Sequence, residues 1–454
     1  MSTAPTHVRP APSGAGRISA VTRELQRRNH SLIPGGSHTY AKGDDQYPEL
    51  APPFIARGRG CRVWDLDHNE YIEYGMGQRS VTLGHAYPSV VKAAQDALAV
   101  GTNFNRPSPL EVACAESLVE LIDAADMVKF TKDGSTANTG AVKLARAYTG
   151  KRVVALCEDH PFFSYDDWAM GVTPVDAGIP DEHTALTDTF RYGDLDSARA
   201  VFDRNEGDVA CLILEPARGA VDENGFLNDL RDLCHRNGAL LILDEQTTAF
   251  RWHEKGAQHL FGVQPDLSTF GKALGNGFAI SALAGRREIM NLGGLDHEEP
   301  RVFLLSTTHG AETHALAACI EVMRIYRDEP VVERLHAAGD RLREGLDQVI
   351  ARHGVAPAVE LSGRSPSLLY ATRDPEGNPS QAYRTLLLQE LCLRGVIAPS
   401  LMVSYSHTDD DIDRTIEAFD GALGVYAGAL EVGTEGLLVG PPSASVYRRY
   451  NHRR

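Results

Sequence analysis

Two short runs of aliphatic residues, at 209–214 and 239–243, constrain the fold more than any other feature of the chain. Neither run contains a polar side chain, so both faces of each predicted strand are buried. A polar stretch with helical spacing, at 227–237, separates the two runs. A buried strand, a helix and another buried strand predict parallel strands joined by a crossover helix. The chain is therefore expected to contain an α/β domain built on a parallel sheet.

The flanking segments extend this pattern and indicate a second lobe. Strands are predicted at 127–130 and 153–157, and a helix at 139–148. Residues 61–74 alternate around a polar turn, which is typical of a hairpin. Beyond residue 330 the sequence turns to charged amphipathic helices, with short strands near 367–370 and 395–398. We therefore expect a smaller α+β domain beside the large one.

Charge and cysteine content limit the partners. The formal net charge is −16, which disfavours nucleic acid and anionic membrane surfaces. No apolar run approaches the roughly 18 residues that span a bilayer. The seven cysteines are scattered and form no C-x-x-C pair, so neither a disulfide framework nor a metal site is predicted. Residues 1–17 lack the apolar core of a signal peptide, and we expect a flexible arm on a cytoplasmic protein.

The first of three motifs at predicted strand ends is the small loop at residues 133–137, which includes Gly134 and Ser135. A small loop that opens a helix presents backbone N–H groups and the positive end of the helix dipole, which suits a phosphate. The alternative is an ordinary turn that only caps the helix.

The second motif is the acidic pair Asp244-Glu245, which closes the apolar run at 239–243. Ligands of open α/β sheets bind at the carboxyl ends of strands. Asp244 is therefore a candidate partner for a metal ion, a ribose hydroxyl or a protonated ring nitrogen, and helix capping is the alternative.

The third motif is Lys272, which lies among Gly271, Gly275 and Gly277. Small neighbours let a planar ligand approach closely, and a desolvated lysine can act as an amine nucleophile. A lysine in an ordinary surface loop is the alternative for this motif alone.

Together the three motifs predict a site for pyridoxal 5'-phosphate (PLP). This cofactor needs an anchor for its phosphate, an anion on its pyridine nitrogen and an amine on its aldehyde. The chain has no dinucleotide-binding glycine motif, no P-loop and no H-E-x-x-H zinc motif.

With these residues in place, the chain resembles the class III PLP-dependent aminotransferases, and among them the glutamate-1-semialdehyde 2,1-aminomutase-like branch. The resemblance spans roughly residues 31–427. It rests on ordered matches: PGG at 34–36, VWDLD at 63–67, LGH at 83–85, KLARAYTG at 143–150, LEP at 214–216, LDE at 243–245, GKALG at 271–275 and HTDDDID at 407–413.

The resemblance implies the fold type I architecture and a homodimer with shared active sites. In this architecture a large parallel-sheet domain, residues 86–330, carries the cofactor. Both chain ends, residues 18–85 and 331–430, build the smaller domain. Residues 431–454, beyond the resemblance, are expected to form a C-terminal tail. Its arginine-rich end at 447–454 is predicted to be solvated, and a specific contact to an anion or a partner is the alternative.

Carried over by position, the resemblance also assigns roles at the cofactor. Lys272 corresponds to the lysine that bonds to the cofactor aldehyde, and Asp244 to the partner of the pyridine nitrogen. Gly134 and Ser135 correspond to the phosphate turn. The remaining cofactor residues are Thr308, which reaches the phosphate from the neighbouring subunit, and the acidic Glu215.

Departures from the family pattern fall around the ring and the substrate. Gln246 replaces the aliphatic residue beneath the ring. The aromatic above the ring is also changed, and we expect His160 or Phe162 to stack there, with His160 preferred. Gln78-Arg79 replaces an aromatic-glycine pair. The active-site glutamate of the aminomutases is missing beyond residue 400.

The predicted function is transfer of an amino group from an amino donor to an aldehyde or ketone acceptor by a ping-pong mechanism. The alternative is intramolecular amine transfer by an aminomutase. A racemase and a non-catalytic PLP-binding protein are more distant alternatives. Four residues are candidates for binding the small-molecule substrate: Arg79, Arg218, His309 and Glu312. Arg79 is the first choice because a guanidinium binds a carboxylate or phosphate through two hydrogen bonds.

Overall fold

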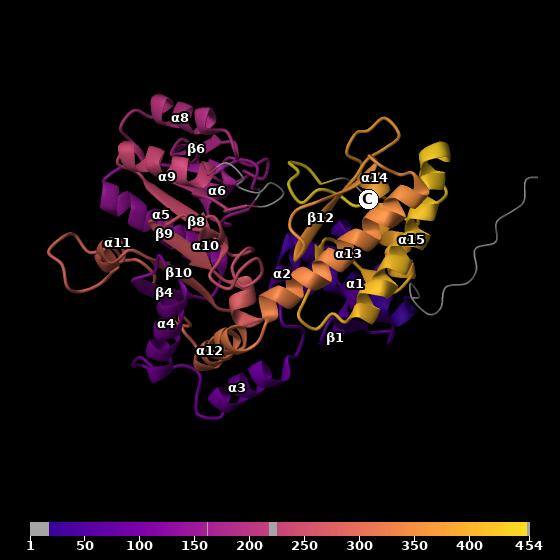
Figure 1. Ribbon diagram of the computed structural model, residues 1–454, viewed down its shortest axis with the longest axis horizontal. Helices are drawn as coiled ribbons and strands as arrows, with labels where there is room; N and C mark the ends of the chain where they lie inside the picture. Colours follow the sequence, from indigo (N-terminus) through magenta and orange to yellow (C-terminus); the bar gives the residue numbers. More distant parts are fainter. Residues whose placement is uncertain (1–17, 161, 218–224, 452–454) are drawn as a thin grey trace, which may run out of the picture.

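A computed structural model describes residues 18–160, 162–217 and 225–451 of the chain (Figure 1). The predicted arm at 1–17 lies outside the described residues. Figure 1 shows a large sheet with its helices on one side of the molecule, and a smaller part built from the two chain ends on the other.

The large sheet has seven strands, and all of them except β10 run in the same direction. Its order is β4 (Met127–Thr131), β10 (Ser281–Gly285), β9 (Leu267–Phe270), β8 (Leu240–Asp244), β7 (Val209–Leu214), β5 (Val153–Cys157) and β6 (Thr187–Phe190). Strands β6, β5, β7, β8 and β9 pair in parallel. β10 is antiparallel to both β9 and β4, so the sheet is mixed where a parallel sheet was expected. Residues 271–280, which include the short 3-10 helix Lys272–Gly275, bring the chain back antiparallel to β9 without a crossover helix.

Helix α5 (Gly134–Thr149) fixes the edge of the sheet where ligands bind. The helix begins after Asp133, whose carboxylate accepts a hydrogen bond from the Thr136 amide at 2.8 Å. It ends at Gly150, whose φ of +70° favours glycine. α5 packs against β4, β7, β8, β9 and β10. Because α5 follows β4, and β4 runs in the same direction as the parallel strands, the N-terminus of α5 lies at the carboxyl ends of the central strands.

The other helices of the large part are shorter. Helix α9 packs on β8, and α8 packs on β6. Their bounds are α6 (Asp167–Met170), α7 (Asp181–Thr184), α8 (Leu195–Arg204), α9 (Phe226–Arg236), α10 (Ala257–Leu260) and α11 (Arg287–Met290).

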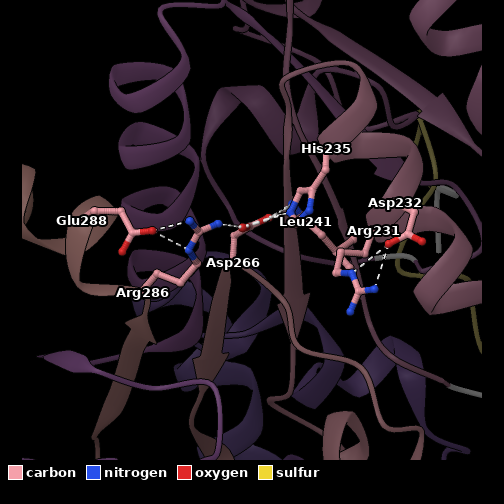
Figure 2. A network of polar contacts seen from close by, with 7 residues as sticks. All are labelled: Arg231, Asp232, His235, Leu241, Asp266, Arg286 and Glu288. Carbon is pink, nitrogen blue, oxygen red and sulfur yellow. Dashed lines mark hydrogen bonds and ion pairs between the residues drawn. The ribbon is translucent and has the colours of Figure 1, made fainter.

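A network of polar contacts at the opposite end of the sheet holds β8, β9 and α9 together (Figure 2). Asp266, just before β9, accepts hydrogen bonds from the Leu241 amide at 2.8 Å and from Arg286 at 2.6 Å. His235 of α9 lies 3.0 Å from the same carboxylate. This end holds the amino ends of the parallel strands, so the network is structural and lies away from Asp244 and Lys272.

The smaller part contains two sheets that mix the chain ends. The four-stranded sheet has the order β1 (Ile55–Arg59), β2 (Arg62–Asp65), β3 (Glu70–Glu73) and β13 (Val396–Ile397), with β13 parallel to β3. The three-stranded sheet has the order β11 (Val359–Ser362), β12 (Ser367–Thr372) and β14 (Leu401–Met402). The smaller domain from both chain ends is thereby confirmed, while the boundaries at residues 85, 330 and 430 stay predictions.

Long helices surround these sheets and connect the two parts. α12 packs on α3 and α4, and α13 packs on α15. Figure 1 shows α13 extending from α12 into the smaller part. Their bounds are α1 (Ala20–Leu32), α2 (Met76–Arg79), α3 (Pro88–Leu98), α4 (Pro109–Leu121), α12 (Thr313–Asp328), α13 (Val331–His353), α14 (Gln381–Leu393) and α15 (Asp409–Val432).

Of the predicted solvated end at 447–454, Arg449 and Tyr450 are exposed, whereas Arg448 makes a specific contact. Arg448 pairs with Asp45 at 2.6 Å, and the Ala444 amide donates to the Asp45 carbonyl at 2.7 Å. The final segment packs back onto the N-terminal region because Asp45 supplies both acceptors. All seven cysteines are buried and unpaired, as expected. None of the described helices is both long and apolar enough to cross a membrane.

Candidate active site

Three loops meet at the carboxyl edge of the large sheet. Asp244 is the last residue of β8, and Lys272 follows β9, which is the neighbouring strand. The third loop connects β4 to the N-terminus of α5. The parallel topology thus brings together the three motifs that were predicted to form one site.

Asp244 is buried and held in a defined orientation. Its side chain is 4% exposed, and it accepts hydrogen bonds from Asn138 Nδ2 at 2.8 Å and from the Gln246 amide at 2.9 Å. Burial raises the pKa of Asp244 to about 6, and the positive charge of Lys272 opposes this rise. A cationic partner at this carboxylate therefore stabilises its ionised form.

Lys272 lies beside this carboxylate and is half-buried. Its Nζ donates a hydrogen bond to Thr247 Oγ1 at 3.3 Å. Burial lowers the pKa of the Lys272 amine, and the charges of Arg79 and Arg251 lower it further, against the opposite effect of Asp244 and Glu215. A lowered pKa leaves more of the amine in its nucleophilic free-base form. The φ of Lys272 is +45°, a strained value typical of functional sites.

The predicted phosphate turn forms a close-fitting cradle. Gly134 is the first residue of α5, where backbone N–H groups have no partner within the helix. A Cβ at Gly134 would lie 2.6 Å from Gln246 Cδ, and one at Gly271 would lie 2.1 Å from Gln246 Oε1. The buried carboxamide of Gln246 thus packs against both glycines, where it donates to the Phe270 carbonyl at 3.2 Å.

His160 and Glu215 form one side of the site. The Glu215 amide donates to His160 Nδ1 at 3.0 Å, and the His160 ring lies against Phe163 and Tyr192. Both residues are buried. Glu215 Oε2 has no hydrogen-bond partner among the described residues. A buried carboxylate oxygen without a partner is costly, and it suits a donor supplied by a bound molecule.

Of the four predicted substrate residues, the structure brings Arg79 into the site. The positive charge of Arg79 lowers the pKa of both Lys272 and Arg251. Arg218 lies outside the described residues. His309 and Glu312 instead form a cluster with Lys132, in which the Glu312 carboxylate accepts from Lys132 and lies 3.1 Å from His309. The lysine contact holds the pKa of Glu312 below its usual value.

Thr308 lies in an exposed segment, and no described contact joins it to Lys272. Its carbonyl accepts a hydrogen bond from Asn103 at 2.9 Å. Its predicted role in a neighbouring subunit stays a prediction. Phe162, the other stacking candidate, is exposed.

Sequence reasoning missed three residues: Asn138, Thr247 and Arg251. Asn138 lies one helical turn beyond Gly134, and Thr247 lies three residues beyond Asp244. Their spacing from predicted residues was the available signal. The sequence carries no signal for Arg251, because an arginine is rarely buried and its burial cannot be read from the sequence.

The described residues match the chemistry of PLP. They place a carboxylate for a pyridinium, an amine with a lowered pKa and a glycine cradle at a helix N-terminus on one sheet edge. In the described part of the chain, no group of three or more His, Cys, Asp or Glu side chains could hold a metal ion.

Fold and site together define a PLP-dependent transferase of fold type I. The family model described as aminotransferase class III matches residues 42–162 and 167–423. The chain belongs to this family.

Among curated relatives, the chain is similar to glutamate-1-semialdehyde 2,1-aminomutase of Desulforamulus reducens. The two are 32% identical over 419 residues, which cover 87% of this chain and 96% of the relative. Among solved structures, the chain is similar to the FumI protein of Sphingopyxis sp. MTA144, which was solved with PLP. The two superpose with a TM-score of 0.82 at 28% identity, and the match covers 93% of this chain and 98% of the FumI chain. An omega-transaminase from Sphaerobacter thermophilus has a TM-score of 0.80 at 26% identity, with coverage of 88% and 97%.

Proposed function

We propose that this protein binds PLP through Lys272 and transfers an amino group from an amino donor to an aldehyde or ketone. The observation that carries the proposal is the pairing of the buried Asp244 with the half-buried Lys272 at the ends of adjacent strands. Burial disfavours the charged form of each side chain, and the opposite charge of its partner stabilises that form. A carboxylate and an amine kept together in this way match the two ends of one pyridoxal ring.

The residues of the cradle bind and orient the cofactor. The backbone N–H groups of Gly134 and Ser135 would hold the phosphate, and Asp244 would accept a hydrogen bond from the pyridine nitrogen. When bound, PLP supplies an aldehyde carbon for amines and a protonated ring that withdraws electrons from the substrate. Asn138 keeps the Asp244 carboxylate in the orientation that this contact needs.

Lys272 moves the proton that amine transfer requires. As a free base, Lys272 Nζ would take a proton from the substrate carbon that bears the amino group and would return it within the same site. The lowered pKa of Lys272 leaves more of Nζ in the free-base form than a solvent-exposed lysine has. Thr247 Oγ1, which accepts a hydrogen bond from Nζ, orients the amine.

Intramolecular transfer by an aminomutase is the second candidate. The curated relative at 32% identity carries the aminomutase name, and this supports the second candidate more directly than the first. Family membership supports both. The first candidate relies on the altered substrate positions, where Gln78 and Arg79 replace the family's aromatic-glycine pair.

Dependence on an amino donor distinguishes the two candidates. The purified holoenzyme is incubated with glutamate 1-semialdehyde alone, and with a panel of aldehydes and ketones in the presence and absence of amino donors. An aminotransferase gives amine products only with a donor. Isomerisation of the semialdehyde without any donor contradicts the first candidate and establishes the second.

We further propose that the active unit is a homodimer in which Thr308 of one subunit approaches the phosphate of the other. The exposed position of the Thr308 segment is compatible with this role. Sedimentation of the holoenzyme as a monomer under assay conditions would contradict it.

A further inference from the structure

Arg79 belongs to a strained turn. Four consecutive residues of α2, from Met76 to Arg79, have φ values of +42°, +58°, +60° and +69°. Of these, only Gly77 tolerates such angles without cost. Backbone of this kind persists only where surrounding contacts hold it in place, and it concentrates at functional sites.

The contact that holds the end of this turn comes from Arg251. Arg251 Nη2 donates to the Arg79 carbonyl at 2.5 Å and to Thr82 Oγ1 at 3.2 Å. Arg251 is 1% exposed, and burial lowers the pKa of its guanidinium to about 10, so the group stays charged at neutral pH. A buried charge is retained at a large desolvation cost, which a role in the site explains.

Arg251 also contacts the loop that meets the catalytic lysine. Its Nη1 donates to the Thr247 carbonyl, and the hydroxyl of the same threonine accepts the hydrogen bond from Lys272. One rigid guanidinium therefore joins the backbone of Arg79 to the backbone beside Lys272. The preceding residue, Phe250, has a φ of +59°, and its carbonyl accepts a hydrogen bond from Tyr326.

We propose that Arg251 is a positioning residue that fixes the spacing between the Arg79 guanidinium, as the binding group for a substrate carboxylate or phosphate, and the amine of Lys272. This inference rests on the proposed function for the role of Lys272. It assigns the substrate an anionic group at a set distance from its reacting carbon.

A lysine cannot take the place of Arg251 in this arrangement. The planar guanidinium presents donors in a fixed fork and holds two carbonyl groups at once, whereas an ammonium is a point charge on a flexible stem. Arg251→Lys therefore keeps the buried charge and loses the fixed spacing. The variant separates a geometric role from an electrostatic one.

The test measures binding of glutarate, an unreactive dicarboxylate, to the PLP-loaded protein through the absorbance of the bound cofactor. Glycerol 3-phosphate serves as the phosphate probe. The variants are Arg251→Lys, Arg79→Ala and the double variant. Arg343→Lys is the matched control, because Arg343 also donates to a backbone carbonyl, that of Gly363, but lies on α13 in the smaller part.

We expect Arg251→Lys and Arg79→Ala each to weaken binding of the preferred probe at least tenfold. The double variant binds no more weakly than Arg79→Ala alone, because Arg251 acts through Arg79. The Arg343→Lys control keeps the native affinity. Native affinity in Arg251→Lys, full additivity in the double variant, or failure of the native protein to bind either probe overturns the proposal.

A second variant covers the case in which Arg251→Lys does not fold. Thr82→Val removes one acceptor of the guanidinium and keeps the side-chain volume, and we expect it to weaken probe binding two- to fivefold. Unchanged affinity in this variant overturns the proposal. Neither probe is an amine or a carbonyl substrate, so the measurement does not depend on turnover. If the protein transfers no amino group but binds the probes, and the two substitutions are not additive, the proposed function is refuted and the role of Arg251 still holds.

Discussion

Single residues carry the chemistry of the site, and Asp244 shows how their environment prepares them. Burial raises the pKa of this carboxylate to about 6, whereas its neighbour Glu245 has a pKa of about 7 for the same reason. The two differ in their partners. Glu245 accepts hydrogen bonds from the amides of Ala257 and Gln258 and holds a loop, while Asp244 lies beside Lys272.

We predict that Asp244→Asn lowers turnover at least about 100-fold, because an amide cannot keep the pyridine nitrogen protonated. Opposite charges about 3 Å apart at an effective dielectric near 20 interact by on the order of 5 kcal/mol, and each 1.36 kcal/mol of barrier is a factor of ten. Steady-state kinetics with saturating PLP measures the effect. Glu245→Gln is the matched control and keeps turnover within a few-fold; equal losses in both variants contradict the assignment of Asp244.

Gly134→Ala is predicted to weaken PLP binding about tenfold, which corresponds to about 1.4 kcal/mol. The added Cβ meets the Gln246 carboxamide at 2.6 Å and displaces it into the cradle. Gln246→Ala in the same protein removes the obstacle, and we expect it to restore much of the affinity. Equilibrium titration of the apoprotein with PLP, followed by absorbance, measures both. A Gly134→Ala variant with native affinity contradicts the cradle.

At the scale of elements, the sheet places the site residues by tying each strand to its neighbour. The sequence predicted the buried strands at 153–157 and 209–214 with the bounds that the structure has, because continuous aliphatic runs have few alternatives. β10 was not predicted. Its run of small residues, Ser281–Gly285, is fully buried between β4 and β9, and the sequence alone does not identify those neighbours.

Asp266→Ala is predicted to lower the free energy of unfolding by about 3 kcal/mol, because it leaves the buried Leu241 amide without its acceptor and removes one of the two carboxylates that contact Arg286 (Figure 2). Urea denaturation measures the change. Asp232→Ala is the control in the same view, since Asp232 is a surface partner of Arg231 and its loss leaves stability unchanged. Native stability in Asp266→Ala contradicts a structural role for the network.

At the scale of the whole molecule, the contacts between the two parts of the chain were the least predictable. The motifs predicted Lys272, Asp244 and the phosphate turn, because each motif is local in sequence. The Arg251 contacts to Arg79 and Thr82 join segments about 170 residues apart and depend on tertiary packing. For the same reason the sequence did not predict that Arg448 pairs with Asp45.

The smaller part has a buried histidine that makes the stability of the molecule depend on pH. Burial lowers the pKa of His407 to about 4, against the opposite effect of Asp411 and an added lowering by Arg62 and His85. The unfolded chain binds the proton more tightly, with a pKa near 6.5. Between pH 6.5 and 4 the unfolded state therefore holds more protons, so stability falls as the pH falls through this window.

We predict that His407 contributes a loss of about 3 kcal/mol between pH 7 and pH 4. Asp244 and Glu245, whose pKa values are raised, contribute with the opposite sign, but equally in the native protein and in a His407→Gln variant. Urea denaturation of both proteins across this range isolates the histidine by difference. Parallel stability curves contradict the prediction.

Whether Lys272 bonds covalently to the cofactor is the question that tests the whole account most directly. The PLP-loaded protein is reduced with borohydride, digested, and mapped by mass spectrometry. The account predicts a pyridoxyl label on Lys272, and no label at that position in a Lys272→Ala variant that has lost turnover. A native protein labelled at another lysine, or at none, contradicts it.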